Sequence, residues 1–129
     1  MILIVGGYCQ GKRDFVKRTW SLADTDLANG AECGADEIFE KRAVYNLHLF
    51  VRRLGQTIQP STELEFFESR IAALQNKIVI SDEVGLGVVP VCGEERRWRE
   101  AVGRVCCLLA QNADEVYRVN AGIPIKIKG

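Results

Sequence analysis

The stretch MILIVGGYCQGKR, residues 1–13, contains the pattern that decides the fold of this chain. Its apolar run Ile2–Val5 is rich in β-branched residues, which predicts a buried parallel strand. The spacing Gly6-x4-Gly11-Lys12 that follows is typical of a phosphate-binding loop. Glycines let backbone N–H groups turn inward around phosphate oxygens, and the lysine adds a positive charge. Arg13 stands where this pattern has the Ser or Thr that holds Mg²⁺.

A helix is predicted directly after this loop, from Lys12 to about Leu27. Apolar residues recur there at helical spacing, namely Val16, Trp20, Ala23 and Leu27. A strand, a glycine-rich loop and a helix in succession form the context that a phosphate-binding loop requires. The N-terminal part of the chain therefore indicates nucleotide binding.

The composition is that of an ordinary globular protein. Its 129 residues predict a single domain, 1–129, which the loop makes a P-loop-like nucleotide-binding domain. Lys+Arg and Asp+Glu both number 17, so no bulk charge points to nucleic acid or an anionic membrane. No apolar run approaches the ~20 residues of a membrane span. The N-terminal apolar run is also too short for a signal peptide.

The chain has 5 cysteines, an odd number, and no Cys-x-x-Cys pair. This usage predicts reduced thiols and a cytoplasmic protein rather than a disulfide framework or a zinc site. Cys9 lies in the loop, where a small loop-filling residue is favoured over a reactive thiol.

The segment after the first helix is predicted to be a loop followed by a long helix. The loop covers Ala28–Ala35, and Asp36 caps a helix that runs to about Leu54 and ends at Gly55. A short strand at Ala43–Tyr45 is the alternative for the first half of that helix.

The remaining elements alternate in type along the chain. They are a helix from Thr62, opened by a capping box and ending near Asn76, a strand at Lys77–Ser81, a loop at Val84–Gly93, a helix at Glu94–Asn112, and strands at Val116–Val119 and Ile123–Ile127. The short turn between the last two strands favours an antiparallel hairpin. The predicted fold class is α/β, a P-loop-type, mostly parallel sheet flanked by helices, with a C-terminal antiparallel hairpin.

Two acidic residues follow the strand Lys77–Ser81. An apolar strand that ends in Asp82 and Glu83, in a chain with a phosphate-binding loop, is the layout that holds Mg²⁺ or its water. The alternative is that the two acids only cap a turn. His48 is the single histidine, and it is interpreted as a packed or surface residue because no neighbour in sequence makes it a nucleophile or base.

Segments at both ends of the chain resemble one enzyme family. They are MILIVGG with the following Gly11-Lys12, SDEVGLGVVP at 81–90, GRV at 103–105, and ADEVYRVNAGIPIKIKG at 113–129. These segments resemble the bifunctional adenosylcobinamide kinase / adenosylcobinamide-phosphate guanylyltransferases of late cobalamin biosynthesis. The family signature Asn-Glu-Val-Gly is matched at Glu83, Val84 and Gly85, with Asp82 in place of Asn.

The resemblance implies a mixed-sheet P-loop fold, a homo-oligomer (a trimer), and GTP or ATP as the nucleotide. It implies phosphorylation of a corrinoid, cobinamide, on a side-chain hydroxyl, followed by GMP transfer from GTP through a guanylyl-histidine. Lys12 and Glu83 are the catalytic residues that it implies, and Asp82 is the candidate anchor for Mg²⁺. The nucleotide-binding residues that it implies are Gly6, Gly7, Tyr8, Cys9, Gln10, Gly11, Lys12 and Arg13.

The chain departs from the family at three places. Arg13 replaces the metal-binding Ser or Thr, and Tyr45 stands where the family has an acid at the end of a strand. The segment that carries the guanylylated histidine has no counterpart, so that role is not assigned to His48. Two functions follow. The first is a cobinamide kinase relative in which Asp82 or Glu83 takes over metal binding, with Asp82 as the better candidate. The second is a catalytically inactive nucleotide- or corrinoid-binding relative with a regulatory or assembly role.

Overall fold

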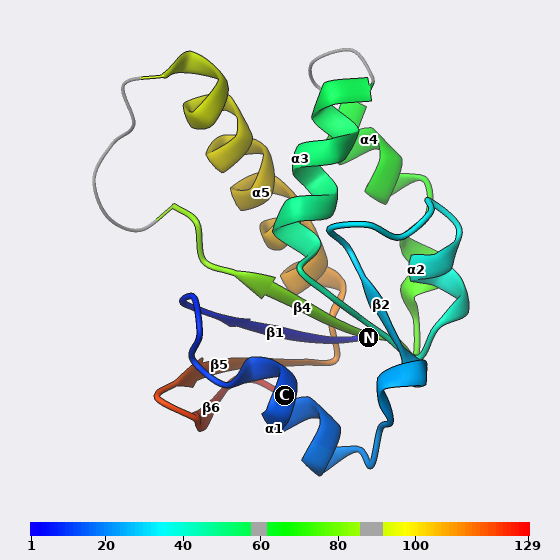
Figure 1. Ribbon diagram of the computed structural model, residues 1–129, viewed down its shortest axis with the longest axis vertical. Helices are drawn as coiled ribbons and strands as arrows, with labels where there is room; N and C mark the ends of the chain where they lie inside the picture. The colour runs from blue at the N-terminus through cyan, green and yellow to red at the C-terminus, as the bar shows by residue number, and fades with distance from the viewer. Residues whose placement is uncertain (58–61, 86–91) are drawn as a thin grey trace.

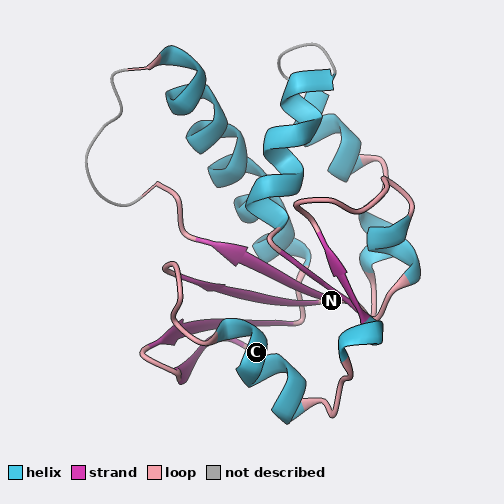
Figure 2. Ribbon diagram, in the orientation of Figure 1, coloured by secondary structure: helices cyan, strands magenta, loops and turns pink. Residues whose placement is uncertain are grey.

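The computed structural model describes residues 1–57, 62–85 and 92–129. The strands of these residues form one sheet in the order β2-β3-β4-β1-β5-β6 (Figures 1 and 2). All neighbouring strands pair in parallel except the last two, which form an antiparallel hairpin. The strands are β1 (Ile2–Gly6), β2 (Leu27–Asn29), β3 (Ala43–Tyr45), β4 (Ile78–Asp82), β5 (Glu115–Asn120) and β6 (Ile123–Lys128). The predicted fold class, a mostly parallel α/β sheet with a C-terminal antiparallel hairpin, is confirmed.

Helices cover both faces of the sheet. Successive residues of each strand point to opposite sides, so each face has its own apolar cluster. Ile4 packs with Val16 of α1 (Lys12–Thr19) in one apolar cluster, whereas Leu3 packs in a second cluster. The second cluster contains buried residues of α3 (Leu47–Thr57), α4 (Thr62–Glu68) and α5 (Gly93–Asn112). The short helix α2 (Glu37–Glu40) and two 3₁₀ turns, Asp24–Asp26 and Ile71–Leu74, complete the described helices.

The central strand β1 sets the position of the candidate site. It lies between β4 and β5, and its last residue, Gly6, is in register with Asp82 at the end of β4. The chain continues from β1 into α1 on one face, whereas the helix that follows β4 in sequence, α5, lies on the other face (Figure 1). Ligands of open α/β sheets bind in the crevice that such a divergence opens at the carboxyl ends of the strands.

The predicted helix from Lys12 to Leu27 is wrong in its second half. α1 ends at Thr19, Ser21 has a left-handed φ of 53°, and Leu27 begins strand β2. Two residues of the apolar spacing, Val16 and Leu27, do lie in the same core cluster, whereas Ala23 is exposed. Burial at helical spacing does not reveal conformation when a second element supplies the later residue, and this is the source of the error.

The predicted loop 28–35 and the predicted helix 36–54 are also corrected. Ala28 and Asn29 belong to β2, and the helix is replaced by α2, β3 and α3. The alternative, a strand at Ala43–Tyr45, is confirmed. Lys41 is extended and Asn46 has a left-handed φ of 55°, so the backbone leaves the helical region on both sides of β3. Gly55 does not end α3, which continues to Thr57.

The helix predicted from Thr62 to near Asn76 is shorter than expected. α4 ends at Glu68, and a 3₁₀ turn at Ile71–Leu74 follows it. The capping box depends on the side chain of Thr62, which lies outside the described side chains, as do residues 58–61 and 86–91 of the predicted connections. No helix of the described residues is long and apolar enough to cross a membrane.

Candidate functional site

The candidate site begins with the loop between β1 and α1. Gly6 must be a glycine because a Cβ there would lie 2.4 Å from the carbonyl oxygen of Val119 on β5. Gly11 has a left-handed φ of 84° and precedes the first residue of α1, Lys12. The structure therefore has the strand, loop and helix that a phosphate-binding loop requires, and phosphate binding itself stays a prediction.

The loop is attached to the turn of the C-terminal hairpin. The backbone N–H of Ala121 donates a hydrogen bond to Oε1 of Gln10 at 2.7 Å. The N–H of Gly122 donates to the backbone oxygen of Gln10 at 2.9 Å. Segments more than a hundred residues apart in sequence thus hold the loop in one conformation.

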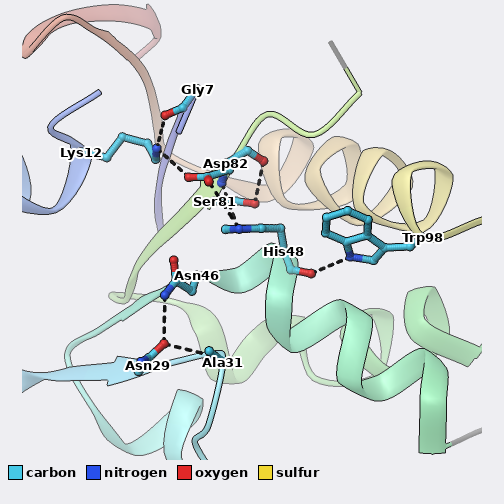
Figure 3. A network of polar contacts seen from close by, with 9 residues as sticks. All are labelled: Gly7, Lys12, Asn29, Ala31, Asn46, His48, Ser81, Asp82 and Trp98. Atoms are coloured by element: carbon cyan, nitrogen blue, oxygen red, sulfur yellow. Dashed lines mark hydrogen bonds and ion pairs between the residues drawn. The ribbon is translucent and has the colours of Figure 1, made fainter. Parts of the chain in front are cut away.

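Lys12 and Asp82 form an ion pair below the loop (Figure 3). The Lys12 ammonium lies 2.7 Å from Oδ1 of Asp82 and donates a second bond to the carbonyl of Gly7 at 2.6 Å. The side chains of Lys12 and Asp82 are only 8% and 16% exposed. The structure therefore places the strand-end acid Asp82 next to the loop lysine, and its predicted role as a magnesium anchor stays a prediction.

His48 contacts the same aspartate through both ring nitrogens. The backbone N–H of Asp82 donates to Nδ1 of His48 at 3.2 Å, and Nε2 lies 3.4 Å from Oδ2 of Asp82. Because Nδ1 accepts a hydrogen bond, the proton of the neutral ring is on Nε2. Burial lowers the pKa of His48 below its ordinary value, although the Asp82 carboxylate acts in the opposite direction. The ring is therefore neutral at pH 7.

An open cleft of about 540 Å³ lies over this cluster. Its wall includes residues of the loop, the start of α1 and the ends of β3 and β4: Tyr8, Cys9, Gln10, Gly11, Lys12, Arg13, Asp14, Tyr45, Asn46, Ile80 and Asp82. The Arg13 guanidinium carbon lies 4.9 Å from the centre of the Tyr45 ring, a cation–π contact. The two residues at which the sequence departs from the predicted family pattern, Arg13 and Tyr45, therefore lie against each other.

The structure does not bring all predicted site residues into the cleft. Gly6, Gly7 and Glu83 are not among its lining residues. Gly6 packs against Val119, and the carbonyl of Gly7 accepts a hydrogen bond from Lys12. Glu83 pairs with Arg118 of β5. Two bonds join this pair, Nε to Oε1 at 3.0 Å and Nη2 to Oε2 at 3.1 Å. Glu83 therefore has a structural partner, and its predicted catalytic role stays a prediction.

Sequence reasoning missed Asn46 and the part that His48 takes in the cluster. Asn46 directly follows the strand β3, and its Nδ2 donates a hydrogen bond to Oδ1 of Asn29 on β2 at 3.0 Å. The alternative prediction, a strand at Ala43–Tyr45, points to both residues. They follow this strand in sequence, and its carboxyl end lies at the same sheet edge as Asp82. The signal was present but was carried by only three residues.

The acids of the cleft show whether its residues could bind a divalent cation. Among the described residues, no group of three or more His, Cys, Asp or Glu could hold a metal ion. Asp14 and Asp82 are the acids in the cleft wall. Mg²⁺ in nucleotide enzymes is often held by one or two carboxylates, with phosphates and waters completing its shell. Asp82 is a carboxylate of this kind, although its Oδ1 pairs with Lys12, and its predicted role as a magnesium anchor stays a prediction.

The fold and the cleft define the class of protein: a mostly parallel α/β protein with a candidate ligand crevice at the carboxyl edge of its sheet. Residues 44–127 match the family described as cobinamide kinase / cobinamide phosphate guanyltransferase. This match covers well over half of the chain, so the chain belongs to that family. The family predicted from the sequence is confirmed.

Two curated proteins illustrate the similarity. The chain is 42% identical over 65 residues to the bifunctional adenosylcobalamin biosynthesis protein CobU of Escherichia coli (strain K12), which covers 47% of this chain and 36% of that protein. It is 45% identical over 51 residues to the protein of the same name from Salmonella typhimurium (strain LT2), covering 40% of this chain and 28% of that protein. The aligned part thus spans about a third of each relative.

Proposed function

We propose that this protein binds a nucleoside triphosphate, GTP or ATP, with its polyphosphate against the loop Gly6–Arg13, and acts as a cobinamide kinase. The supporting observation is the Lys12–Asp82 pair, 2.7 Å apart at the cleft beneath the loop. Burying two charges is costly and adds little to stability, so a pair at an open cleft favours a role in binding. Loop amides, a lysine and a carboxylate are the groups that polyphosphate recognition needs.

Phosphoryl transfer depends on positioning and on neutralising the charge that develops on phosphate oxygens. In the proposal, the Lys12 ammonium turns from Asp82 to the phosphates, and Arg13 adds a second positive charge beside Tyr45. Asp82 would be the residue that holds Mg²⁺, and the ion would supply charge neutralisation at the phosphates. The acceptor is the hydroxyl of the cobinamide side chain, in keeping with the family description.

The proposal does not include guanylyl transfer. His48 is 6% exposed and both of its ring nitrogens contact Asp82. A nucleophilic histidine needs a free ring nitrogen that faces the nucleotide. The homo-oligomer, the corrinoid site and the cytoplasmic location stay predictions.

A second candidate function is a catalytically inactive relative that binds nucleotide or corrinoid and regulates or assembles with another protein. One observation favours it. Arg13 and Tyr45 stand where the resemblance implies a metal-binding Ser or Thr and a strand-end acid, and the Arg13 guanidinium lies 4.9 Å from the centre of the Tyr45 ring. A positive charge beside the phosphates repels a metal cation.

Cobinamide phosphorylation with GTP or ATP and Mg²⁺, in the wild type and in Asp82→Asn, decides between the two functions. Asp82→Asn restores the family residue while Arg13 and Tyr45 remain, so it isolates the carboxylate. We expect turnover to fall at least about 100-fold in the variant while metal-free nucleotide binding is retained.

Three other outcomes have distinct meanings. Unchanged turnover in Asp82→Asn would remove Asp82 from the mechanism. Wild-type protein that binds nucleotide without turnover would favour the inactive relative. An acid-labile label on His48 after incubation with α-labelled GTP would show that guanylyl transfer was wrongly excluded.

A further inference from the structure

His48 is joined to Asp82 more extensively than a residue that only fills space in the core. Its Nδ1 accepts the backbone N–H of Asp82 at 3.2 Å, and its Nε2 lies 3.4 Å from the carboxylate oxygen Oδ2 (Figure 3). The other carboxylate oxygen, Oδ1, is held by Lys12 at 2.7 Å. Each oxygen of Asp82 thus has its own partner, one from α1 and one from α3.

His48 itself is held from a third element. Its backbone oxygen accepts a hydrogen bond from Nε1 of Trp98 on α5 at 2.8 Å. The guanidinium of Arg52 lies 3.7 Å over the Trp98 ring and pairs with Glu95 at 2.7 Å. Trp98 therefore fixes the backbone of His48. The charged groups that act on the imidazole are Asp82, Lys12 and Arg52.

We expect the two contacts of the Asp82 carboxylate, with Lys12 and with His48, to respond differently when a polyphosphate enters the cleft. Lys12 is the group with a reason to leave Asp82, because phosphate oxygens carry more negative charge than one carboxylate. His48 lies behind the carboxylate and is 6% exposed. Its contact to Oδ2 therefore survives, and hydrogen bonds that are long in a free protein commonly shorten in the complex.

We propose that His48 is a positioning residue of this cleft, which keeps the Asp82 carboxylate oriented to hold Mg²⁺ through Oδ1 after Lys12 has turned to the phosphates. This inference rests on the proposed function. The residue acts through Asp82 and touches neither nucleotide nor acceptor. Outer partners of this kind orient the groups that hold a cation, and their loss typically lowers affinity or activity by about 10- to 100-fold.

The test compares nucleotide affinity with and without Mg²⁺ by titration calorimetry, in the wild type, His48→Ala and His48→Gln. We expect His48→Ala to reduce the gain in affinity due to Mg²⁺ by about 10-fold or more. Metal-free affinity should change less than about threefold, because Lys12 and the loop amides remain. His48→Gln should restore part of the gain, since its amide N–H can reach Oδ2.

Lys17→Ala is the matched control. It removes a cation of α1 that pairs with Asp24 at the surface. We expect it to retain the Mg²⁺-dependent gain. A gain that is unchanged in His48→Ala, or lost equally in Lys17→Ala, would overturn the positioning role.

A measurement without nucleotide separates this inference from the proposed function. The single histidine allows unambiguous nitrogen NMR of the free protein. We expect the proton on Nε2, protected from exchange in the wild type and unprotected in Asp82→Ala. If the wild type binds no nucleotide, the proposed function fails. Positioning is then decided by this signal, and a proton on Nδ1 or equal exchange in both proteins overturns it.

Discussion

Burial separates two cysteines that are neighbours in sequence on α5. Cys107 is exposed, whereas burial raises the pKa of the Cys106 thiol to about 11. Only the thiolate reacts with alkylating reagents, and at pH 8 a thiol with that pKa is about one part in a thousand ionised. The same helix thus carries one accessible thiol and one protected thiol.

We predict that iodoacetamide at pH 8 modifies Cys107 at least about tenfold faster than Cys106 in the native protein. Both residues lie in one peptide, so fragment masses give the two rates in a single experiment. Alkylation in denaturant, where burial is absent, is the control and should equalise them. Equal native rates would show that α5 is packed differently from this account.

At the scale of elements, two glycines carry opposite constraints. Gly6 ends β1 against the carbonyl of Val119, where a Cβ would approach to 2.4 Å. Gly103 lies inside α5, and apart from its own helix backbone a Cβ there would meet no atom of the described residues within 4 Å. The first glycine is required by the packing of β1 on β5, and the second is not required by any contact.

We therefore predict that Gly6→Ala lowers the free energy of unfolding by at least about 1–3 kcal/mol. The atom in the way is a backbone oxygen, which cannot move aside as a flexible side chain can. Gly103→Ala should raise it by about 0.5–1 kcal/mol, since alanine favours the helix. Urea unfolding of the two variants and the wild type measures both values. Similar effects of the two substitutions would contradict the close approach at Gly6.

The elements also show what a sequence pattern can and cannot predict. β1, β4 and α5 are predictable because each is a strong pattern with clear ends: an apolar run before Gly6, an apolar run before Asp82, and a long amphipathic repeat. β2 and β3 have three residues each, too few to show the two-residue period of a strand. Both depend on pairing with neighbours distant in sequence, which local pattern does not contain.

At the scale of the whole molecule, the parallel pairing of β1 with β4 brings the loop after β1 next to Asp82 at the end of β4. The loop lysine and Asp82 were predictable as a pair, because carboxyl ends of parallel strands meet at one edge. The contact of His48 with Asp82 was not, since it requires β3 to be a strand and α3 to start at Leu47. The resulting cleft combines residues from three segments that are far apart along the chain.

The central claim is that this cleft binds polyphosphate through Lys12, and one titration tests it most directly. GTP and ATP are titrated by calorimetry against the wild type, Lys12→Ala and Lys17→Ala. Lys17 is the matched control, because it lies on the same helix but pairs with Asp24 at the surface, 2.6 Å away. Circular dichroism verifies that each variant is folded.

The account predicts that Lys12→Ala weakens binding by about 10- to 100-fold, the loss expected for a charge-assisted hydrogen bond. Lys17→Ala should stay within about twofold of the wild type, because a surface ion pair contributes little. Equal affinity of the wild type and Lys12→Ala for the nucleotide would contradict the claim.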